Sequence, residues 1–454
     1  MLITRKSIFA VLIALFVLAG FGIASAAVVG GLADNTGLTT LPPTLNNYIA
    51  PTGVGDTLIY NYYNVDGNVT YFTVVNTDSK NGIRARIRFK EAADINGACS
   101  GSVEVLDFDI CLSANDMWTG VIKRNPNDAN GGAMLCSPDT DTLVSDLATP
   151  TPHSDIFMKI PAALANGGCV PFKYGGQNIN PNVTALNTRE GYFTIIGQRT
   201  IEAEPASCVP DADTNVGAPT NSLFGNAAVI NAAPTGSTFT YDATAIANFA
   251  GGDLLANVPA GRGTSYPDLG DGQDTINGVN YILTKNMLYS IFDLSGVTST
   301  EFVVTLPTKA LTDAKCTGLF GDDRVTYQFF NDAEQPTTGS GCEFSPCPQQ
   351  QEDSLPYEVN VIRPKQGVGI MTTQVEVLPL VESAYNFGWF VLDLNPDLSA
   401  GPNGAITPAH ATGYPVPAFS TAYGWPALGL TLLDVSEITA NSGAFAMPYS
   451  VDVR

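Results

Sequence analysis

The sequence predicts a mainly β protein made of antiparallel β-sandwiches with long loops and few short helices. Three observations lead to this fold class. Strand-like segments recur along the chain between clusters of Gly, Pro, Asn and Asp. Only 14% of the residues are charged, and Gly, Ala, Asn, Thr and Ser fill the difference, as in many secreted β proteins. One segment alone approximates a helical period, and no fixed-period repeat indicates a solenoid or a propeller.

The 26 N-terminal residues have the layout of a secretory signal peptide. The pair Arg5-Lys6 precedes an apolar run over residues 8–23, and Ala-Ser-Ala at 24–26 forms a small-x-small cleavage site. We therefore expect a mature chain that starts at Ala27 and is secreted to the extracellular cell surface. After residue 23 no run approaches the roughly 20 apolar residues of a transmembrane helix, so no membrane span is expected in the mature chain.

The mature chain is strongly acidic. The sequence has 21 Lys and Arg residues against 43 Asp and Glu, a formal charge of −22. Cleavage removes Arg5, Lys6 and no acid, which leaves 19 cations and a formal charge of −24. Such a surface repels phosphate backbones, so we expect no nucleic-acid partner. It suits either plain solubility or the coordination of hard cations such as Ca²⁺.

The elements are predicted in the following order. Residues 27–50, interrupted by Gly-Gly and Pro-Pro pairs, predict an extended arm. Residues 57–63 predict a strand, Asp66-Gly67 a hairpin turn, and residues 68–75 the partner strand of that hairpin. Further predicted strands cover residues 83–90, 103–112, 191–201, 237–241, 301–306, 324–330, 357–362, 374–378 and 389–394. Residues 279–294 are the one helix candidate, because their apolar positions approximate a 3.6-residue period.

These elements divide the chain into four parts. The signal peptide (1–26) and the arm (27–50) precede a β-sandwich region (51–205) and a second β-rich region (206–454). The Ala-, Asn- and Thr-rich stretch at 211–263 is the expected junction. The two regions could instead form one continuous large β domain, since the mature chain is long enough for either arrangement.

Several strand and turn segments carry a family resemblance, at residues 55–63, 74–77, 86–92, 105–109, 112–113, 116–120, 190–196, 223–227, 237–243 and 300–309. Their order resembles an uncharacterised family of exported bacterial cell-surface proteins. The resemblance touches roughly residues 55–310, and weakly the chain from 356 onward. It implies a surface location and a β-sandwich architecture, and it supplies no activity.

Eight cysteines in an exported chain predict disulfides rather than a metal site. They are Cys99, Cys111, Cys136, Cys169, Cys208, Cys316, Cys342 and Cys347. The connectivity stays open, because eight cysteines allow 105 pairings, although the C-x4-C pair Cys342 and Cys347 is the easiest to join. With two histidines, His153 and His410, far apart in the sequence, zinc or copper is not expected.

The densest charged motif is a strand with one basic face. In residues 83–90 the apolar residues alternate with Arg84, Arg86, Arg88 and Lys90. One interpretation is an interface for an acidic partner, such as another copy of this chain. The other, which we favour, is cross-strand pairing with carboxylates on neighbouring strands, such as Glu91, Glu104, Asp107 or Asp109.

Three acidic loops are candidates for Ca²⁺, the one cofactor considered. Asp211, Asp213 and Asn215 have the spacing of half a calcium loop, but Val216 replaces its turn glycine and Ser222 its closing Glu. Asp268, Asp271 and Asp274 form the second candidate, and Asp139 with Asp141 the third. The alternative is ordinary turn chemistry, in which Asp and Asn bond to their own backbone.

No motif supports catalysis, so we expect a non-enzymatic protein. A G-x-S-x-G elbow is absent, and no spacing singles out a carboxylate pair for glycoside hydrolysis. The function we expect is that of a structural or assembly protein, forming homo-oligomers or polymers as surface-layer or filament subunits do. An adhesin that binds carbohydrate or another surface polymer is the alternative. Its sugar-stacking residues would be Tyr60, Tyr62, Tyr63, Trp389 and Trp425. A secreted hydrolase comes third.

Overall fold

A computed structural model of the chain describes residues 47–92, 102–139, 143–144, 168–175, 182–205, 208, 215–231, 238–250, 253–254, 269, 283–285, 287–293, 299–307, 324–331, 351–364, 376–377, 386–394, 425–434 and 444–448. These residues confirm a mainly β fold of antiparallel sheets packed as sandwiches. Among the described strands, only β20 and β21 pair in parallel. No helix in the described part of the chain is long and apolar enough to cross a membrane.

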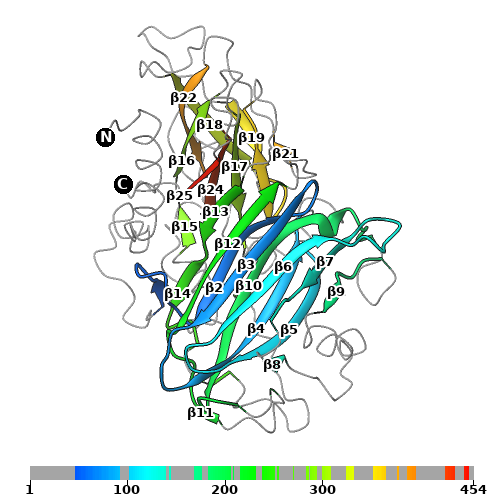
Figure 1. Cartoon of the computed structure of the whole chain (residues 1–454). Coiled ribbons are helices and arrows are strands. Elements are labelled where there is room, and N and C mark those ends of the chain that lie inside the picture. The colour runs from blue at the N-terminus through cyan, green and yellow to red at the C-terminus, as the bar shows by residue number, and fades with distance from the viewer. Residues whose placement is uncertain are drawn as a thin grey trace, which may run out of the picture.

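Two sheets form the first sandwich, the lower half of Figure 1. Sheet A has the order β1 (Tyr48–Ile49), β14 (Thr244–Ala247), β2 (Thr57–Asn64), β10 (Glu190–Ile201), β4 (Gly82–Glu91), β5 (Glu104–Leu112) and β8 (Leu143–Val144), and β11 (Asn215–Gly217) also pairs with β10. Sheet B has the order β13 (Thr238–Asp242), β12 (Leu223–Asn231), β3 (Asn68–Asn76), β6 (Met117–Arg124), β7 (Ala133–Cys136) and β9 (Cys169–Pro171). The 3₁₀ turn η1 (Asn187–Arg189) leads into β10.

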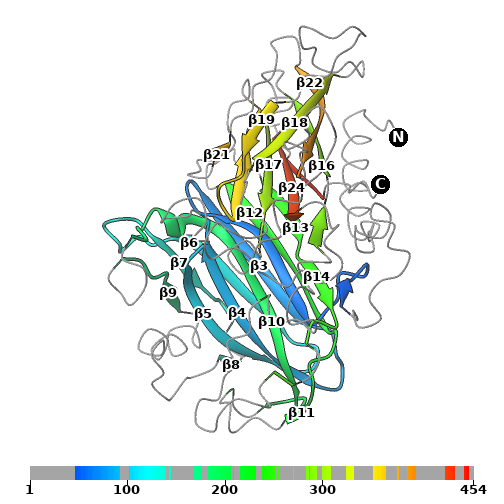
Figure 2. The same ribbon diagram turned by 180° about the vertical axis from the view of Figure 1, so that it is seen from behind.

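Three further sheets form the upper half of the molecule in Figures 1 and 2. Sheet D has the order β16 (Met287–Asp293), β22 (Phe387–Asp393), β18 (Arg324–Asn331) and β19 (Gln351–Ser354). Sheet E has the order β21 (Glu376–Val377), β20 (Val359–Ile362), β17 (Ser299–Thr305), β24 (Leu428–Asp434) and β25 (Ala444–Pro448). Sheet C is the short pair of β15 (Thr284–Lys285) and β23 (Trp425–Pro426).

The core of the first sandwich is an aromatic cluster between sheets A and B. Phe72 of β3 lies at its centre, with ring centroids 4.5 Å from Phe193, 5.7 Å from Trp118 and 6.0 Å from Phe89. Strand β6 carries Gly120 opposite Phe72, and a Cβ atom at that position would lie 2.3 Å from the Phe72 ring. Because glycine has no Cβ atom, β6 can approach the ring closely. A side chain there would force the two strands apart.

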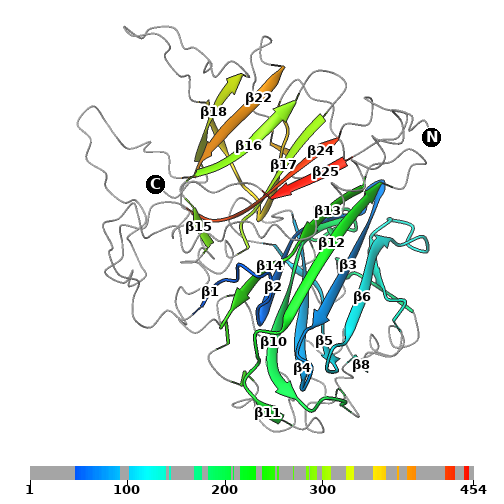
Figure 3. The ribbon, with the colours of Figure 1, turned by 60° about the vertical axis from the view of Figure 1, so that its left-hand side comes forward.

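Sheet E is buried on both faces and joins the two halves. Along β17, Val303 belongs to the core cluster of the first sandwich, whereas Phe302 and Val304 belong to the cluster between sheets D and E. This alternation is the period of two that strand geometry imposes. One side of sheet E therefore packs on the first sandwich and the other on sheet D, and the edge strands β13 and β25 lie beside each other (Figure 3).

The chain between β2 and β3 turns at Asp66-Gly67, where Gly67 has φ +76°, but it does not form the predicted hairpin. Strand β2 pairs with β10 and β14 in sheet A, and β3 pairs with β6 and β12 in sheet B. The turn therefore connects the two layers. The prediction was wrong because adjacent strands with a turn signal usually pair, whereas here each strand has partners far along the chain.

The predicted helix at residues 279–294 is also wrong in its described part, where Met287–Asp293 form β16. Leu288 and Phe292 are fully buried against sheet E, while Tyr289 and Ile291 on the other face are partly buried. A strand with apolar residues on both faces lacks clear alternation. Its pattern is therefore hard to distinguish from that of a helix.

The first sandwich extends beyond residue 205, the expected boundary. Strands β11 to β14, at residues 215–247, all belong to sheets A and B. The Ala- and Asn-rich stretch thus supplies strands rather than a linker. At the end of the predicted arm, Tyr48–Ile49 pair with β14 of the same chain, and residues 27–46 of the arm lie outside the described residues.

Candidate functional site

The basic face of β4 is an internal ion-pair cluster. The Arg84 and Arg86 side chains are fully buried. Arg84 Nη2 lies 2.6 Å from Asp109 Oδ2, and Arg86 Nη1 lies 2.8 Å from Asp109 Oδ1. Arg86 also pairs with Asp107, and Arg88 Nε lies 2.5 Å from Glu104 Oε2. Of the two interpretations, the structure shows cross-strand pairing for these three arginines, which therefore do not form an exposed interface.

Strand register explains this cluster. Arg86 lies opposite Asp109, and Arg88 lies opposite Asp107, on the antiparallel neighbours β4 and β5. Arg86 reaches Asp109 directly across the strand pair. The Arg84–Asp109 and Arg86–Asp107 pairs are diagonal, a distance that long side chains also span. Arg84 also donates from Nε to Gln198 Oε1 of β10, at 3.1 Å. Removing one partner from a buried ion pair is far more costly than removing an exposed one.

The fourth cation, Lys90, lies at the junction between the two halves. Its ammonium is 5.9 Å from the centroid of the Tyr192 ring. The Tyr192 hydroxyl donates to Glu358 Oε2 (2.9 Å) and to the Pro307 carbonyl (3.1 Å), both from the second half of the chain. Thr305 Oγ1 donates to the Asn61 carbonyl at 2.6 Å. Polar contacts thus fix sheet E against β2 and β10.

A second buried group beside this junction contains Tyr62, Asn64 and Glu190. The Tyr62 hydroxyl donates to Glu190 Oε2 (3.0 Å) and accepts from Asn64 Nδ2 (3.0 Å). Burial raises the pKa of the Tyr62 phenol well above its ordinary value, and the charges of Glu190 and Glu301 raise it further. The phenol therefore stays protonated at any physiological pH and acts as a hydrogen-bond donor.

Burial raises the pKa of the Asp56 carboxyl group towards neutrality, to about 6. Backbone N–H groups of Phe249 (2.9 Å) and Ala250 (3.0 Å) donate to it and lower the pKa, but desolvation outweighs them. The carboxylate fastens the chain after β14 to the start of β2. Nothing in the sequence pattern indicated it, because a single Asp after Gly reads as a turn residue.

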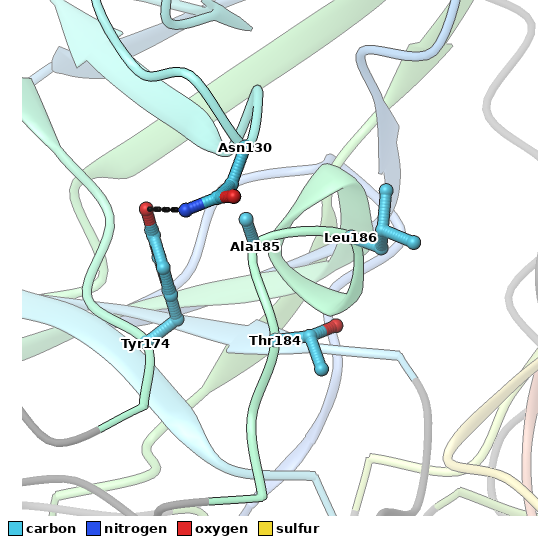
Figure 4. Close-up of a pocket in the computed structure, with 5 residues that line it drawn as sticks. All are labelled: Asn130, Tyr174, Thr184, Ala185 and Leu186. Atoms are coloured by element: carbon cyan, nitrogen blue, oxygen red, sulfur yellow. Dashed lines mark hydrogen bonds between the residues drawn. The ribbon is translucent and has the colours of Figure 1, made fainter.

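A surface pocket of about 400 Å³ lies where several loops of the first sandwich meet (Figure 4). It is lined by Asn130, Tyr174, Thr184, Ala185 and Leu186. Its polar atoms bond to one another and to neighbours. Tyr174 donates to Asp128 at 2.8 Å, Asn130 Nδ2 donates to the Tyr174 hydroxyl at 3.4 Å, and Thr184 Oγ1 lies 2.6 Å from Asn187 Oδ1.

Asp128 organises the loop behind this pocket. Desolvation raises its pKa, but hydrogen bonds from the Asn130 and Gly132 backbone, from Tyr174, and the charge of Arg189 lower it below the ordinary value overall. Arg189 donates to the carbonyls of Gly131 (2.9 Å) and Asn130 (3.2 Å). These interactions hold the loop behind the pocket rigidly in place. Leu186 is the most exposed apolar residue of the pocket wall.

The aromatic residues considered for sugar stacking separate into two groups. Tyr60, Tyr62 and Tyr63 are fully buried and face no solvent. Trp389 lies on the outer face of sheet D, but its ring stacks on Phe330 at 4.1 Å with an interplanar angle of 9°. Tyr289 lies 6.1 Å away. Both neighbours are rings of adjacent strands, so Trp389 belongs to a cross-strand ladder rather than a flat sugar platform. Trp425 lies in β23.

Two of the predicted disulfides are present in the described chain. Cys111 joins Cys208, and Cys136 joins Cys169. The first fastens β5 to the segment after β10, and the second joins β7 to β9 in sheet B. The other four cysteines (Cys99, Cys316, Cys342 and Cys347) lie outside the described residues, as do His153 and His410.

Most of the calcium candidates lie outside the described residues: Asp211, Asp213, Asp268, Asp271, Asp274 and Asp141. Asn215 begins β11, and the Asp139 backbone N–H donates to Ser137 Oγ at 3.1 Å. Among the described residues no group of three His, Cys, Asp or Glu side chains is placed to hold a metal ion. The calcium hypothesis thus stays a prediction.

Comparison with protein-family models, with curated proteins and with solved structures finds no match to this chain. The resemblance to exported cell-surface proteins therefore stays a prediction that rests on the strand and turn segments alone.

Proposed function

We propose that this chain is an exported, non-enzymatic structural protein of the cell surface that assembles with copies of itself. One observation carries the proposal. The densest charge grouping of the described chain, Arg84 and Arg86 with Asp107 and Asp109, is buried and fixes β4 to β5. Two disulfides and the buried hydrogen bonds at the junction of the two halves also make the molecule rigid, which suits a structural role.

The test is the assembly state of the mature chain, without residues 1–26. Light scattering after size-exclusion chromatography and negative-stain electron microscopy should show oligomers, sheets or filaments whose population grows with concentration. A strict monomer across the accessible concentration range, with and without Ca²⁺, contradicts the proposal. Hydrolytic activity on a panel of polysaccharides and esters would contradict its non-enzymatic part.

Calcium belongs to this proposal as a stabilising ion of the acidic loops. A ligand that binds only the folded state raises stability by mass action. Millimolar Ca²⁺ should therefore raise the melting temperature, and Asp213→Ala or Asp271→Ala should reduce that rise. An identical melting curve in EDTA and in Ca²⁺ removes calcium from the proposal and leaves self-assembly unaffected.

Carbohydrate binding is the second candidate, and the pocket beside Tyr174 favours it. A tyrosine ring, an amide and a hydroxyl around an apolar wall are groups that small neutral ligands use for orientation. Glycan-array binding by the mature chain, lost in Tyr174→Ala and kept in Trp389→Leu, is the result expected of this candidate. Binding that survives Tyr174→Ala would place the glycan elsewhere.

A further inference from the structure

The outer face of sheet B is open and nearly uncharged. Strands β13, β12, β3 and β6 present it, and Figure 1 shows no other described element in front of them. Its outward positions are Thr238, Thr240, Asp242, Phe224, Asn226, Ala228, Ile230, Val69, Tyr71, Thr73, Val75, Met117, Thr119, Val121 and Lys123. One acid and one base cancel, in a chain of net charge −22.

Exposed apolar side chains gather on this face. Seven large apolar side chains are exposed in the described chain, and three of them, Met117 (51%), Ile230 (37%) and Tyr71 (36%), lie here. Val69, Val75 and Phe224 beside them are partly buried. Scattered exposed apolar residues are ordinary, but a contiguous group on one sheet face indicates an interaction surface.

We propose that this face, called the sheet B face, is where two copies of the chain pack against each other. The inference deepens the proposed self-assembly and rests on it. A second copy is the occupant because both partners carry the same strong negative charge. Two such chains repel wherever acidic residues meet, so close approach needs a surface without net charge. The sheet B face meets that need without a partner of opposite charge.

The size and the side-chain packing of the sheet B face also fit a dimer interface. Strands β13, β12, β3 and β6 have 5, 9, 9 and 8 residues, and at about 3.4 Å per residue and about 4.8 Å between strands they give a plan area of roughly 500 Å². Because side chains project from the sheet, the accessible area exceeds the plan area and approaches the roughly 800 Å² that each partner of a stable complex buries. The small residues Ala228, Thr73 and Thr119 lie between the larger Tyr71, Met117 and Ile230, so two copies can interdigitate as facing sheets do.

The pairing is isologous, because the same patch contributes from both copies, and such contacts close as dimers. Larger assemblies then need a second, different contact. This inference therefore concerns the first step of assembly, a dimer in which the two sheet B faces pack against each other.

The variants that test this are Tyr71→Lys and Ile230→Lys in the mature chain. Each places an unpaired charge in the centre of the interface, so the dissociation constant for dimers should rise by at least about tenfold. Phe387→Lys is the matched control, since Phe387 is also an exposed large apolar residue (48%) but lies on sheet D. It should leave the dissociation constant unchanged. Sedimentation velocity measures all three, and near-ultraviolet circular dichroism checks that each variant is folded.

Footprinting of the unmodified chain gives a second test that needs no variant. Hydroxyl radicals oxidise exposed Tyr71 and Met117 readily, and Phe387 serves as the internal reference. Raising the protein concentration through the dimer range should reduce oxidation of Tyr71 and Met117 severalfold and leave Phe387 unaffected.

The outcomes separate the two proposals. If the chain assembles but both lysine variants assemble equally well, and Tyr71 and Met117 stay reactive, the sheet B face is not the interface while self-assembly stands. If the unmodified chain is monomeric at every concentration, both are overturned. If Phe387→Lys alone blocks dimers, the interface lies on sheet D.

Discussion

At the scale of single residues, the molecule uses its scarce cations for structure. Arg84 and Arg86 are fully buried, and Asp109 bonds to both of them. A carboxylate shared by two buried guanidinium groups is the most sensitive point of the cluster. Its loss leaves two positive charges with fewer partners in a site that water does not reach.

Asp109→Asn should therefore lower the free energy of unfolding by about 3–5 kcal/mol, the range for breaking a buried ion pair. Glu104→Gln is the matched control, because the Arg88–Glu104 pair is partly exposed, at 15% and 24%. We expect about 1 kcal/mol or less from the control. Urea unfolding followed by tryptophan fluorescence measures both, and equal losses would contradict the importance of burial.

Asp56 gives a pH dependence with a defined sign. Its folded pKa of about 6 exceeds the ordinary 3.8, so between these values the folded state holds the proton more tightly. The stability that Asp56 contributes to the folded state is fully present below the unfolded pKa and is lost as pH rises through 6. Relative to Asp56→Asn, which does not titrate, the natural chain should lose up to about 3 kcal/mol of stability between pH 3.5 and 7, taking about 1.4 kcal/mol for each pH unit.

Asp78 provides the control of opposite sign. The Asn81 side chain and the backbone N–H groups of Lys80 and Asn81 bond to its carboxylate and lower its pKa. The stability it contributes is present above the unfolded pKa and lost as pH falls. Stability curves of Asp56→Asn and Asp78→Asn should therefore diverge from the natural chain in opposite directions. Parallel curves would show that neither carboxyl titrates as inferred.

At the scale of elements, the sequence predicts best where one face of a strand differs clearly from the other. The alternation at residues 83–90 predicts β4 (Gly82–Glu91) within one residue at each end. It cannot show that both faces are buried, because that depends on layers supplied by distant parts of the chain. Arg84 looks like a surface residue in the sequence, and only the presence of Asp109 on β5 allows it to lie inside.

The same limit explains the errors. The pairing of β2 with β10 and the two-sided burial of β16 depend on contacts between segments far apart, which local patterns do not encode. The candidate sites were the hardest features to predict from the sequence. The Tyr174 pocket and the Asp56 carboxylate come from loops whose residues have no shared spacing in the sequence.

The aromatic ladder of sheet D gives a prediction at this scale. Trp389 contacts Phe330 on β18 and Tyr289 on β16, so it links three strands. Trp389→Leu should lower the free energy of unfolding by about 1–3 kcal/mol through lost ring contacts and burial. Phe387→Leu, at a more exposed position of the same strand, should change it by about 0.5 kcal/mol or less. Thermal unfolding compares the two variants.

At the scale of the whole molecule, the two halves share one hydrophobic core. Val303, Val361 and Leu430 of sheet E pack in the same cluster as the first sandwich. Separate domains usually meet through smaller and more polar surfaces, so this arrangement indicates a single cooperative unit.

Scanning calorimetry should accordingly show one unfolding transition for the natural chain. Tyr192→Phe removes the hydrogen bonds to Glu358 and Pro307 across the junction and should lower the melting temperature while broadening the transition. Tyr71→Phe, on the open face of sheet B, is the control and should leave the curve unchanged. Two resolved transitions in the natural chain would show that the halves unfold independently.

The central place of β10 in sheet A bears on the order in which the molecule can mature. Its neighbours β2 and β4 are made more than a hundred residues earlier, and each keeps an unsatisfied flank until β10 arrives between them. Such long-range closure is slow, and strand flanks exposed meanwhile invite pairing with other chains. In the exported protein that we propose, the chain would emerge from its N-terminus for a long interval without a completed layer. Its safe delivery would then depend on protection from a holding factor or on export at low local concentration.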